Sequence, residues 1–181
     1  MDAIALDAQE RMSKSIESLK SSLSTLRTGR ANAQMLSGID VDYYGSPTPI
    51  NQIASISIPE PRQLLIKPYD KNDVKSIVSA INASDLGINP INEGTCVRLI
   101  IPALTEDRRR DIVKQAKKYG EEAKISIRNI RRDYMDLVKM DEEMSEDYQK
   151  RVQDEIQKVT DEMSKKIDVI VSEKEKEIMT V

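Results

Sequence analysis

Three arginines within five positions are the side chains of this sequence that most clearly indicate a binding function. Arg128, Arg131 and Arg132 stand in the stretch "ISIRNIRRDYM", where apolar residues recur at helical spacing. If this stretch is a helix, its apolar residues face the core and the arginines lie on the outward sides. A guanidinium group binds phosphate through two parallel hydrogen bonds, so the pattern predicts contact with a polyanion.

The basic character extends along the whole of the helix that we expect from Thr105 to about residue 141. Residues 105–132 carry ten basic and five acidic residues, whereas residues 133–181 carry eight basic and fifteen acidic ones, and the net charge of the chain is −3. Charge is therefore sorted along the chain. The outward basic positions are Arg110, Lys114, Lys117, Lys124, Arg128, Arg131 and Arg132.

Two interpretations of this basic side stay open. It either binds a polyanion, or it is a solvated face balanced by acids on the C-terminal helix. The lysines fit both interpretations, while the clustered arginines fit phosphate binding better. The chain has no Phe or Trp and few aromatic residues in all, so platforms for stacking single-stranded bases are missing. A structured RNA, recognised by its shape and phosphates, is therefore the favoured polyanion.

The composition argues against catalysis, a cofactor or a metal. The chain contains no histidine and one cysteine, Cys96, which excludes Ser-His-Asp and Cys-His arrangements and histidine-based zinc sites. Gly-rich phosphate loops are absent. The acidic run "DEEMSED" is typical of a solvated turn between two helices. We expect a protein that binds and does not catalyse, and an enzyme is the least favoured class.

Cysteine usage and hydropathy predict the compartment. A single cysteine cannot form a disulfide within the chain, which is consistent with a reducing environment. The start "MDAIALDAQE" lacks the features of a signal peptide, and no apolar run approaches the roughly 20 residues that span a bilayer. We expect a cytoplasmic protein without a membrane partner.

The basic side must be positioned by three amphipathic helices. Their apolar stripes are Ile4, Ala8, Met12, Ile16, Leu19, Leu23 and Leu26; Ile112, Ala116, Tyr119, Ala123, Ile127, Ile130, Tyr134 and Leu137; and Val152, Ile156, Val159, Met163, Ile167 and Ile170. None of these stripes can be buried alone, so we expect an elongated three-helix bundle. Thr105 and Ser145 are the expected N-caps of the second and third helices.

Between the first two helices the period changes. Alternating apolar residues predict strands near 39–43, 53–60, 62–69 and 95–102, with a turn at 45–49 and a helix after Asp70 or Asn72. The fold class is therefore α+β: a discontinuous bundle of residues 1–30 and 105–181 and a small inserted β/α/β domain of residues 31–104. The two connections between them, near Arg30–Ala31 and Leu104–Thr105, form a plausible hinge.

Six motifs in order resemble the ribosome recycling factor family of bacteria. They are "LRTGRAN" at 26–32, "YYGSPTPINQIASI" at 43–56, "ASDLGINP" at 83–90, "LTEDRRRDIVK" at 104–114, "IRNIRRD" at 127–133 and "SEDY" at 145–148. The resemblance implies a bundle with an inserted domain in a transfer-RNA-like outline. It also implies binding to the large-subunit ribosomal RNA of the post-termination ribosome. With elongation factor G and GTP, such a protein promotes dissociation of the subunits and release of messenger RNA.

The same resemblance assigns residues. Its RNA-contacting cluster falls on Arg128, Arg131 and Arg132, with further basic positions at Arg27 and Arg30 around Gly29, and at Arg108, Arg109 and Arg110. Its hinges fall on Arg30, Ala31 and Asn32, and on Ala103, Leu104, Thr105 and Glu106. Lys117 and Lys124 are added by the charge pattern. The link "LVKMDEEMSEDY" is about one helical turn shorter than is usual in the family.

Two hypotheses from different classes follow. The first is a monomeric ribosome-binding factor whose apolar stripes are buried within one chain. The alternative is a scaffold protein whose stripes pair with other coiled coils.

Overall fold

A computed structural model describes residues 1–180 of the chain and separates them into two compact units. One unit comprises Met1–Arg27 and Glu106–Thr180, and the other comprises Thr28–Thr105. The predicted domain boundaries lie within three residues of these limits. The long helices and the small β-rich unit agree with the predicted α+β class.

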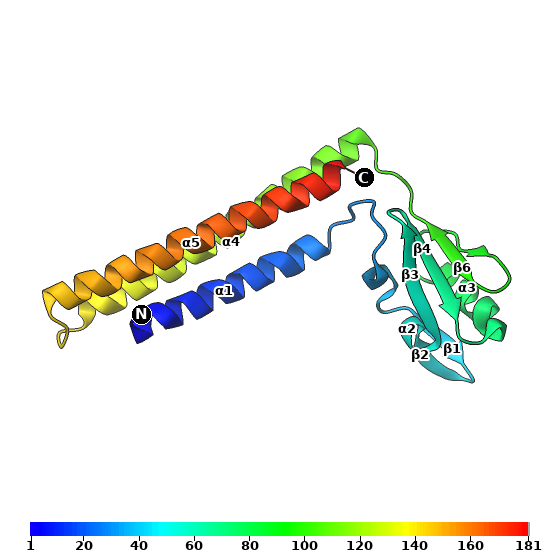
Figure 1. The fold of residues 1–181 in the computed structure, drawn as a ribbon, viewed down its shortest axis with the longest axis horizontal. Coiled ribbons are helices and arrows are strands. Elements are labelled where there is room, and N and C mark those ends of the chain that lie inside the picture. The colour runs from blue at the N-terminus through cyan, green and yellow to red at the C-terminus, as the bar shows by residue number, and fades with distance from the viewer. Residues whose placement is uncertain (181) are drawn as a thin grey trace. The chain divides into compact units, whose positions relative to one another are not determined.

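The first unit is a bundle of α1 (Ala3–Ser24), α4 (Glu106–Met140) and α5 (Glu146–Met179), which lie side by side in Figure 1. The Ser15 and Ser126 hydroxyl oxygens, 2.9 Å apart, join α1 to α4. Ser145 caps α5 as predicted, since its Oγ accepts a hydrogen bond from the Tyr148 main-chain N–H at 3.2 Å. The short link between Met140 and Glu146 makes α4 and α5 antiparallel neighbours.

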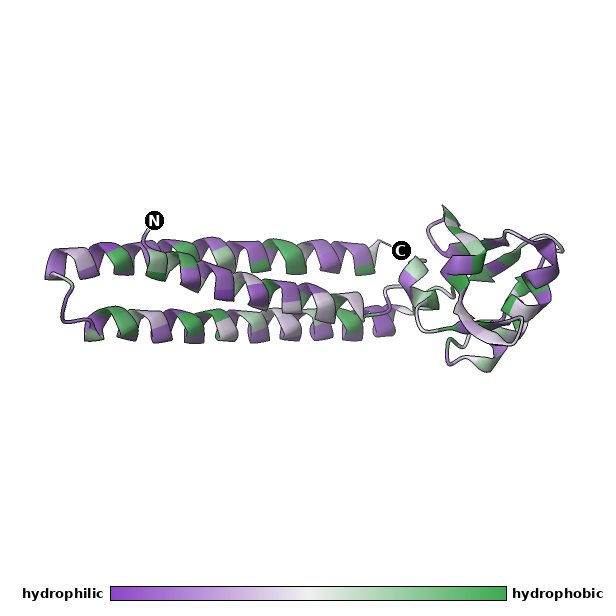
Figure 2. Cartoon of the chain, turned by 90° about the horizontal axis from the view of Figure 1, so that it is seen from below, coloured by the Kyte–Doolittle hydropathy of each residue, from purple (hydrophilic) through white to green (hydrophobic). Residues whose placement is uncertain are grey.

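The predicted stripes form most of the bundle core, and Figure 2 shows apolar and polar residues recurring along each helix. The buried residues are Ala5, Ala8, Met12, Ile16, Leu19 and Leu23 of α1; Ile112, Ala116, Gly120, Ala123, Ile127, Ile130, Tyr134 and Val138 of α4; and Val152, Ile156, Val159, Thr160, Met163, Ile167 and Ile178 of α5. Burying these stripes is what holds the solvent-facing sides of the helices in place.

The predicted stripe of α4 is wrong at its C-terminal end. Leu137 is 55% exposed, while the neighbouring Val138 is fully buried. Leu137 continues the side of α4 on which Ser126 and Tyr134 contact α1. Because α1 begins only at Ala3, little of that helix extends far enough to cover Leu137. Val138 lies one turn after Tyr134 and continues the buried stripe.

The second unit is built from a four-stranded antiparallel sheet and a separate hairpin. The sheet has the order β3 (Ala54–Glu60), β4 (Gln63–Pro68), β6 (Val97–Ile100) and β5 (Ile91–Asn92). The hairpin pairs β1 (Asp40–Tyr43) with β2 (Ser46–Pro49). The helical segments are η1 (Ala33–Leu36), α2 (Ile50–Ile53), η2 (Lys71–Asp73) and α3 (Val74–Ala83). Asp70, one of the two predicted caps of the helix, instead caps η2, accepting from the Asn72 main-chain N–H at 2.9 Å; the N-cap of α3 is Asp73, whose side chain forms no capping hydrogen bond.

This unit has its own core, in which α3 packs on one face of the sheet through Ile77 and Ile81. Leu64 and Leu99, fully buried, project toward the same core from β4 and β6. The region 45–49, predicted as a turn, is instead largely strand β2. Its two prolines are tolerated because β2 pairs only with β1 and leaves its other edge unpaired among the described residues. The turn itself is shorter and lies at Tyr44 and Gly45.

Candidate nucleic-acid interface

A set of basic residues on α4 reaches α5 at two positions. We call the set Arg110, Lys117, Lys124, Arg128, Arg131 and Arg132 the basic edge. Two of its members contact α5 directly, Lys124 through Asp168 and Arg131 through Gln157. The edge exists because the buried stripe of α4 leaves the intervening positions of each turn toward solvent.

The three clustered arginines of the edge are not neutralised by carboxylates. Arg128 and Arg132 are exposed and form no ion pair within residues 1–180. Arg131 is half-buried, and its Nε donates to Gln157 Oε1 at 2.7 Å. Its partner is therefore a neutral amide. Positive charge of this kind, concentrated on a packed helix, attracts phosphate groups.

The other members of the edge differ in how much charge they present. Lys124 Nζ lies 2.5 Å from Asp168 Oδ1, and the lysine side chain is only 23% exposed, so this charge is largely compensated. Arg110 pairs with Glu106 at 2.7 Å, but both side chains are mostly exposed and such a pair is weak in water. Lys117 is exposed and takes part in no ion pair in the described part of the chain.

The arginines at the start of α4 do not form one surface. Arg108 is exposed, whereas Arg109 is half-buried and its Nη1 donates to the Met179 carbonyl oxygen at 3.4 Å. That carbonyl lies at the C-terminal end of α5, where a cation is favoured by the helix dipole. Arg109 thus links the start of α4 to the end of α5.

The remaining predicted RNA-binding residues lie in the segment that follows α1. Arg27 and Arg30 are exposed and flank a buried Thr28 and Gly29. Gly29 has a φ of +81°, a conformation that side chains other than glycine adopt at a cost. The glycine therefore allows the tight course of the chain between these two arginines.

Two residues of the first predicted hinge form hydrogen bonds within the β-rich unit. The Ala31 main-chain N–H donates to the Pro61 carbonyl at 2.7 Å, and Asn32 Oδ1 accepts from the Gln34 N–H at 2.9 Å. Ala31 and Asn32 are thus fixed within the β-rich unit. Only Arg30, of the three predicted residues, lies in the irregular segment 25–30.

The second predicted hinge lies between the end of the sheet and the start of α4. Ile101 N–H donates to the Arg62 carbonyl at 2.8 Å, which ties the end of β6 to the sheet. Glu106 is the first residue of α4 and belongs to the bundle. Ala103, Leu104 and Thr105 lie between these points, in a segment with neither helix nor strand.

A tyrosine anchors the helix that carries the edge. The hydroxyl of the buried Tyr134 donates to an Asp7 carboxylate oxygen of α1, and the Arg11 guanidinium lies 5.7 Å from the ring centroid. Burial raises the pKa of the Tyr134 phenol, and the hydrogen bond to Asp7 raises it further. These contacts hold α4 against α1 one turn from Arg131.

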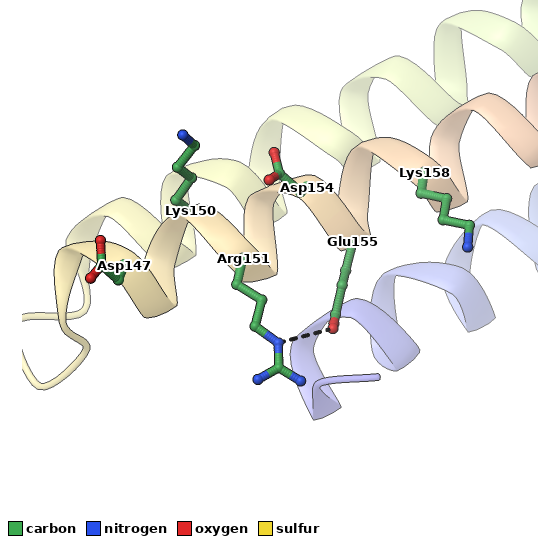
Figure 3. Close-up of a pocket in the computed structure, with 6 residues that line it drawn as sticks. All are labelled: Asp147, Lys150, Arg151, Asp154, Glu155 and Lys158. Atoms are coloured by element: carbon green, nitrogen blue, oxygen red, sulfur yellow. Dashed lines mark ion pairs between the residues drawn. The ribbon is translucent and has the colours of Figure 1, made fainter.

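The surface of α5 near its start carries a shallow hollow with charged walls. It is lined by six charged residues of α5, drawn in Figure 3: Asp147, Lys150, Arg151, Asp154, Glu155 and Lys158. In Figure 3 the Arg151 side chain reaches toward Glu155, whose carboxylate oxygen lies 3.8 Å from the Arg151 Nε. Alternating charges on an open helix surface are a solvated face.

Metal sites and membrane-spanning helices are both absent from residues 1–180. No group of three or more His, Cys, Asp or Glu side chains is arranged to hold a metal ion. No helix in this part of the chain is long and apolar enough to cross a membrane.

The residue that the sequence did not reveal is Gln157. Nothing in the pattern of α5 distinguishes it from Gln149 or Gln153. Its role depends on the register between α4 and α5, which a helical period alone does not determine.

Fold and site together define an α+β protein in which a three-helix bundle presents uncompensated arginines and an inserted β-rich unit has its own core. The family model for ribosome recycling factor matches residues 19–179. The chain belongs to the ribosome recycling factor family. It is accordingly a translation factor and not a catalyst of a chemical reaction.

Relatives and solved structures of the same family match over nearly the full chain. The chain is 52% identical over 184 residues to the ribosome-recycling factor of Staphylococcus carnosus, covering 100% of both chains. It is 54% identical over 183 residues to that of Streptococcus pyogenes serotype M28, covering 99% of both. A solution structure of a ribosome recycling factor matches with a TM-score of 0.76 at 40% identity, over 98% of this chain and 96% of the other.

A further structural match comes from an assembly. The Thermus thermophilus ribosome recycling factor, in models with the Escherichia coli elongation factor G bound to the E. coli post-termination complex, has a TM-score of 0.62 at 44% identity. The match covers 97% of this chain and 96% of the other.

Proposed function

We propose that this protein binds the post-termination ribosome in the cytoplasm and, with elongation factor G and GTP, promotes subunit dissociation and release of messenger RNA. Two findings support the proposal: the family relationship over the whole chain, and the similarity to a recycling factor placed with elongation factor G on a post-termination complex. The protein acts by binding, and the energy of GTP hydrolysis is supplied by the translocase.

The observation that carries the binding step is the pair of exposed arginines without carboxylate partners. Arg128 and Arg132 lie on a helix whose opposite side is packed, so their charges are held at a fixed spacing. Phosphates of the large-subunit ribosomal RNA are the polyanion that we propose for them. Arg131 and Lys117 add to the same edge, while Lys124 and Arg110 contribute less because each faces a carboxylate.

Arg27 and Arg30 would extend the RNA contact beyond α4. The segments 25–30 and 102–105, which flank the β-rich unit, would act as the hinge through which elongation factor G moves this unit. These limits follow from the hydrogen bonds that fix Ala31 and Ile101 in the β-rich unit.

The test compares two arginine substitutions of equal size. Arg132→Ala should weaken binding to purified post-termination ribosomes in a pelleting assay, because it removes an uncompensated charge. Arg151→Ala is the control, since Arg151 is also exposed on the bundle but lies on α5 away from the edge. We expect unchanged helical circular dichroism for both variants and reduced subunit dissociation, with elongation factor G and GTP, for Arg132→Ala alone. Equal affinities for the two variants would contradict the site.

The scaffold hypothesis is disfavoured by the burial of the apolar stripes. Met12 of α1, Ile127 of α4 and Ile156 of α5 are all fully buried by the other helices of the same chain. Within residues 1–180, these buried stripes are therefore not free to pair with another coiled coil. Sedimentation at micromolar concentration should give a monomer.

A further inference from the structure

We propose that Gln157 of α5 is a positioning residue for the RNA-binding edge, because it orients the Arg131 guanidinium without neutralising it. This inference rests on the proposed function and goes beyond it, since it extends the site from α4 onto a second helix. Arg131 Nε donates to Gln157 Oε1 at 2.7 Å.

The Gln157 side chain is itself held in one orientation. Its Nε2 donates to Asp161 Oδ1, one turn further along α5, at 2.9 Å. Because the amide nitrogen is engaged by Asp161, the amide oxygen is the atom left to face Arg131. The relay from Asp161 through Gln157 fixes the guanidinium at its Nε, which leaves the two terminal nitrogens of Arg131 available to a phosphate.

The structure contains an internal comparison. Lys124 reaches α5 on the same edge, about two turns from Arg131, but meets the carboxylate of Asp168 at 2.5 Å. The two contacts have similar geometry and opposite electrostatic consequences. A carboxylate cancels the charge of its partner, whereas an amide accepts the same hydrogen bond and leaves the net charge at +1. The choice of amide or carboxylate on α5 thus decides which cations of α4 act on a phosphate.

This reasoning predicts opposite effects for two nearly isosteric substitutions. Gln157→Glu converts the Arg131 contact into an ion pair and should lower ribosome affinity roughly tenfold at moderate salt. The slope of log affinity against log salt should become shallower by about one, as for the loss of one phosphate contact. Asp168→Asn releases Lys124 and should raise affinity and steepen the slope by a similar amount.

A further variant separates positioning from charge. Gln157→Ala removes the orienting contact but not the charge of Arg131, so affinity should fall only about twofold to threefold with an unchanged salt slope. A role for Gln157 limited to bundle stability would give the same loss in Gln157→Ala and Gln157→Glu, in proportion to a lower melting temperature. Circular dichroism of each variant provides that comparison.

The experiment measures binding to purified post-termination ribosomes at several salt concentrations for these variants and for Arg131→Ala. The proposal is supported if Gln157→Glu approaches Arg131→Ala in affinity and slope while Asp168→Asn moves the other way. If Arg131→Ala binds ribosomes more weakly while Gln157→Glu binds them like the wild type, the role of Gln157 is overturned and the proposed function stands. If Arg131→Ala binds like wild type, the role of Gln157 is overturned. If Arg132→Ala also binds like wild type, the proposed RNA-binding edge is overturned as well.

Discussion

α4 packs closely against Val171 of α5 at Gly120, and adding one methyl group there should test the packing that supports the basic edge. A Cβ built on Gly120 lies 2.7 Å from Val171 Cγ2, and 3.8 Å from both Val171 Cβ and Cγ1. Carbon atoms in contact are ordinarily ~3.5–4.0 Å apart. The overlap of about 1 Å must be relieved by moving a stiff, β-branched side chain or by separating the two helices.

The magnitude is the balance of two opposed effects. Overpacking of this kind costs about 1–3 kcal/mol. Replacing glycine with alanine inside a helix contributes about 1 kcal/mol in the stabilising direction. We therefore expect Gly120→Ala to lower the free energy of unfolding of the bundle by about 1 kcal/mol. In a Val171→Ala background the overlap disappears, so the same substitution should stabilise the bundle by up to about 1 kcal/mol.

Urea unfolding followed by far-ultraviolet circular dichroism measures both effects in a double-mutant cycle. Asn129→Ala is the matched control, because Asn129 is an exposed position of the same helix. This substitution should stabilise the bundle to an equal extent with Val171 and with Val171→Ala. If Gly120→Ala has the same effect with and without Val171, the steric account of the α4–α5 contact is refuted.

Three further predictions concern the turn, the core and the N-terminus. Tyr44 has a φ of +51° and is 87% exposed at the tip of the β1–β2 hairpin. Because asparagine adopts a positive φ more readily, Tyr44→Asn should raise the stability of this unit by about 1 kcal/mol, measured as a higher melting temperature. A lower melting temperature would contradict the turn geometry. Because Val138 is buried and Leu137 is exposed, Val138→Ala should lower the free energy of unfolding by about 2–3 kcal/mol and Leu137→Ala by less than about 0.5 kcal/mol. The reverse order in urea unfolding would show that Leu137, as the sequence predicts, belongs to the buried stripe. The hydrogen bond from Tyr148 lowers the pKa of Asp2, followed by that from the Ile4 N–H, so the ionised form is favoured by folding. The contribution of ionised Asp2 to the free energy of unfolding is present above about pH 4 and is lost as the pH falls through the lowered folded-state pKa. The stability difference between wild type and Asp2→Asn should therefore shrink over this pH range. A difference that stays constant in unfolding experiments would contradict the linkage.

The helices of the bundle could be predicted from the sequence because their stripes are long and regular. The period of Ile112, Ala116, Ala123 and Ile127 determines which side of α4 is buried, and therefore which side carries the arginines. The stripe failed at Leu137, where burial depends on how far α1 extends and not on the period of α4. The length of the helix that packs against α4 therefore decides which residues are buried at this end.

The β-rich unit was predicted less completely. Pro47 and Pro49 argue against a strand in general, and the sequence does not show that β2 is an edge strand with only one partner. A short strand such as β5, with two residues, has too few positions to display alternation.

The candidate site was predicted at the level of the helix side but not at the level of individual charges. The spacing of Arg128, Arg131 and Arg132 indicates a common edge. It does not indicate that Lys124 meets Asp168 while Arg131 meets Gln157, because these pairs depend on the register between two antiparallel helices. The sequence also does not show that Ala31 and Ile101 are hydrogen-bonded within the β-rich unit, because these bonds join residues distant in sequence.

The most direct test of the central claim is the salt dependence of ribosome affinity for the wild type and for the double variant Arg128→Ala/Arg132→Ala. If these two guanidinium groups contact phosphates, the slope of log affinity against log salt concentration should become shallower by about two in the double variant. An unchanged slope, or a wild-type affinity that does not depend on salt, would contradict the claim that uncompensated arginines on α4 bind ribosomal RNA.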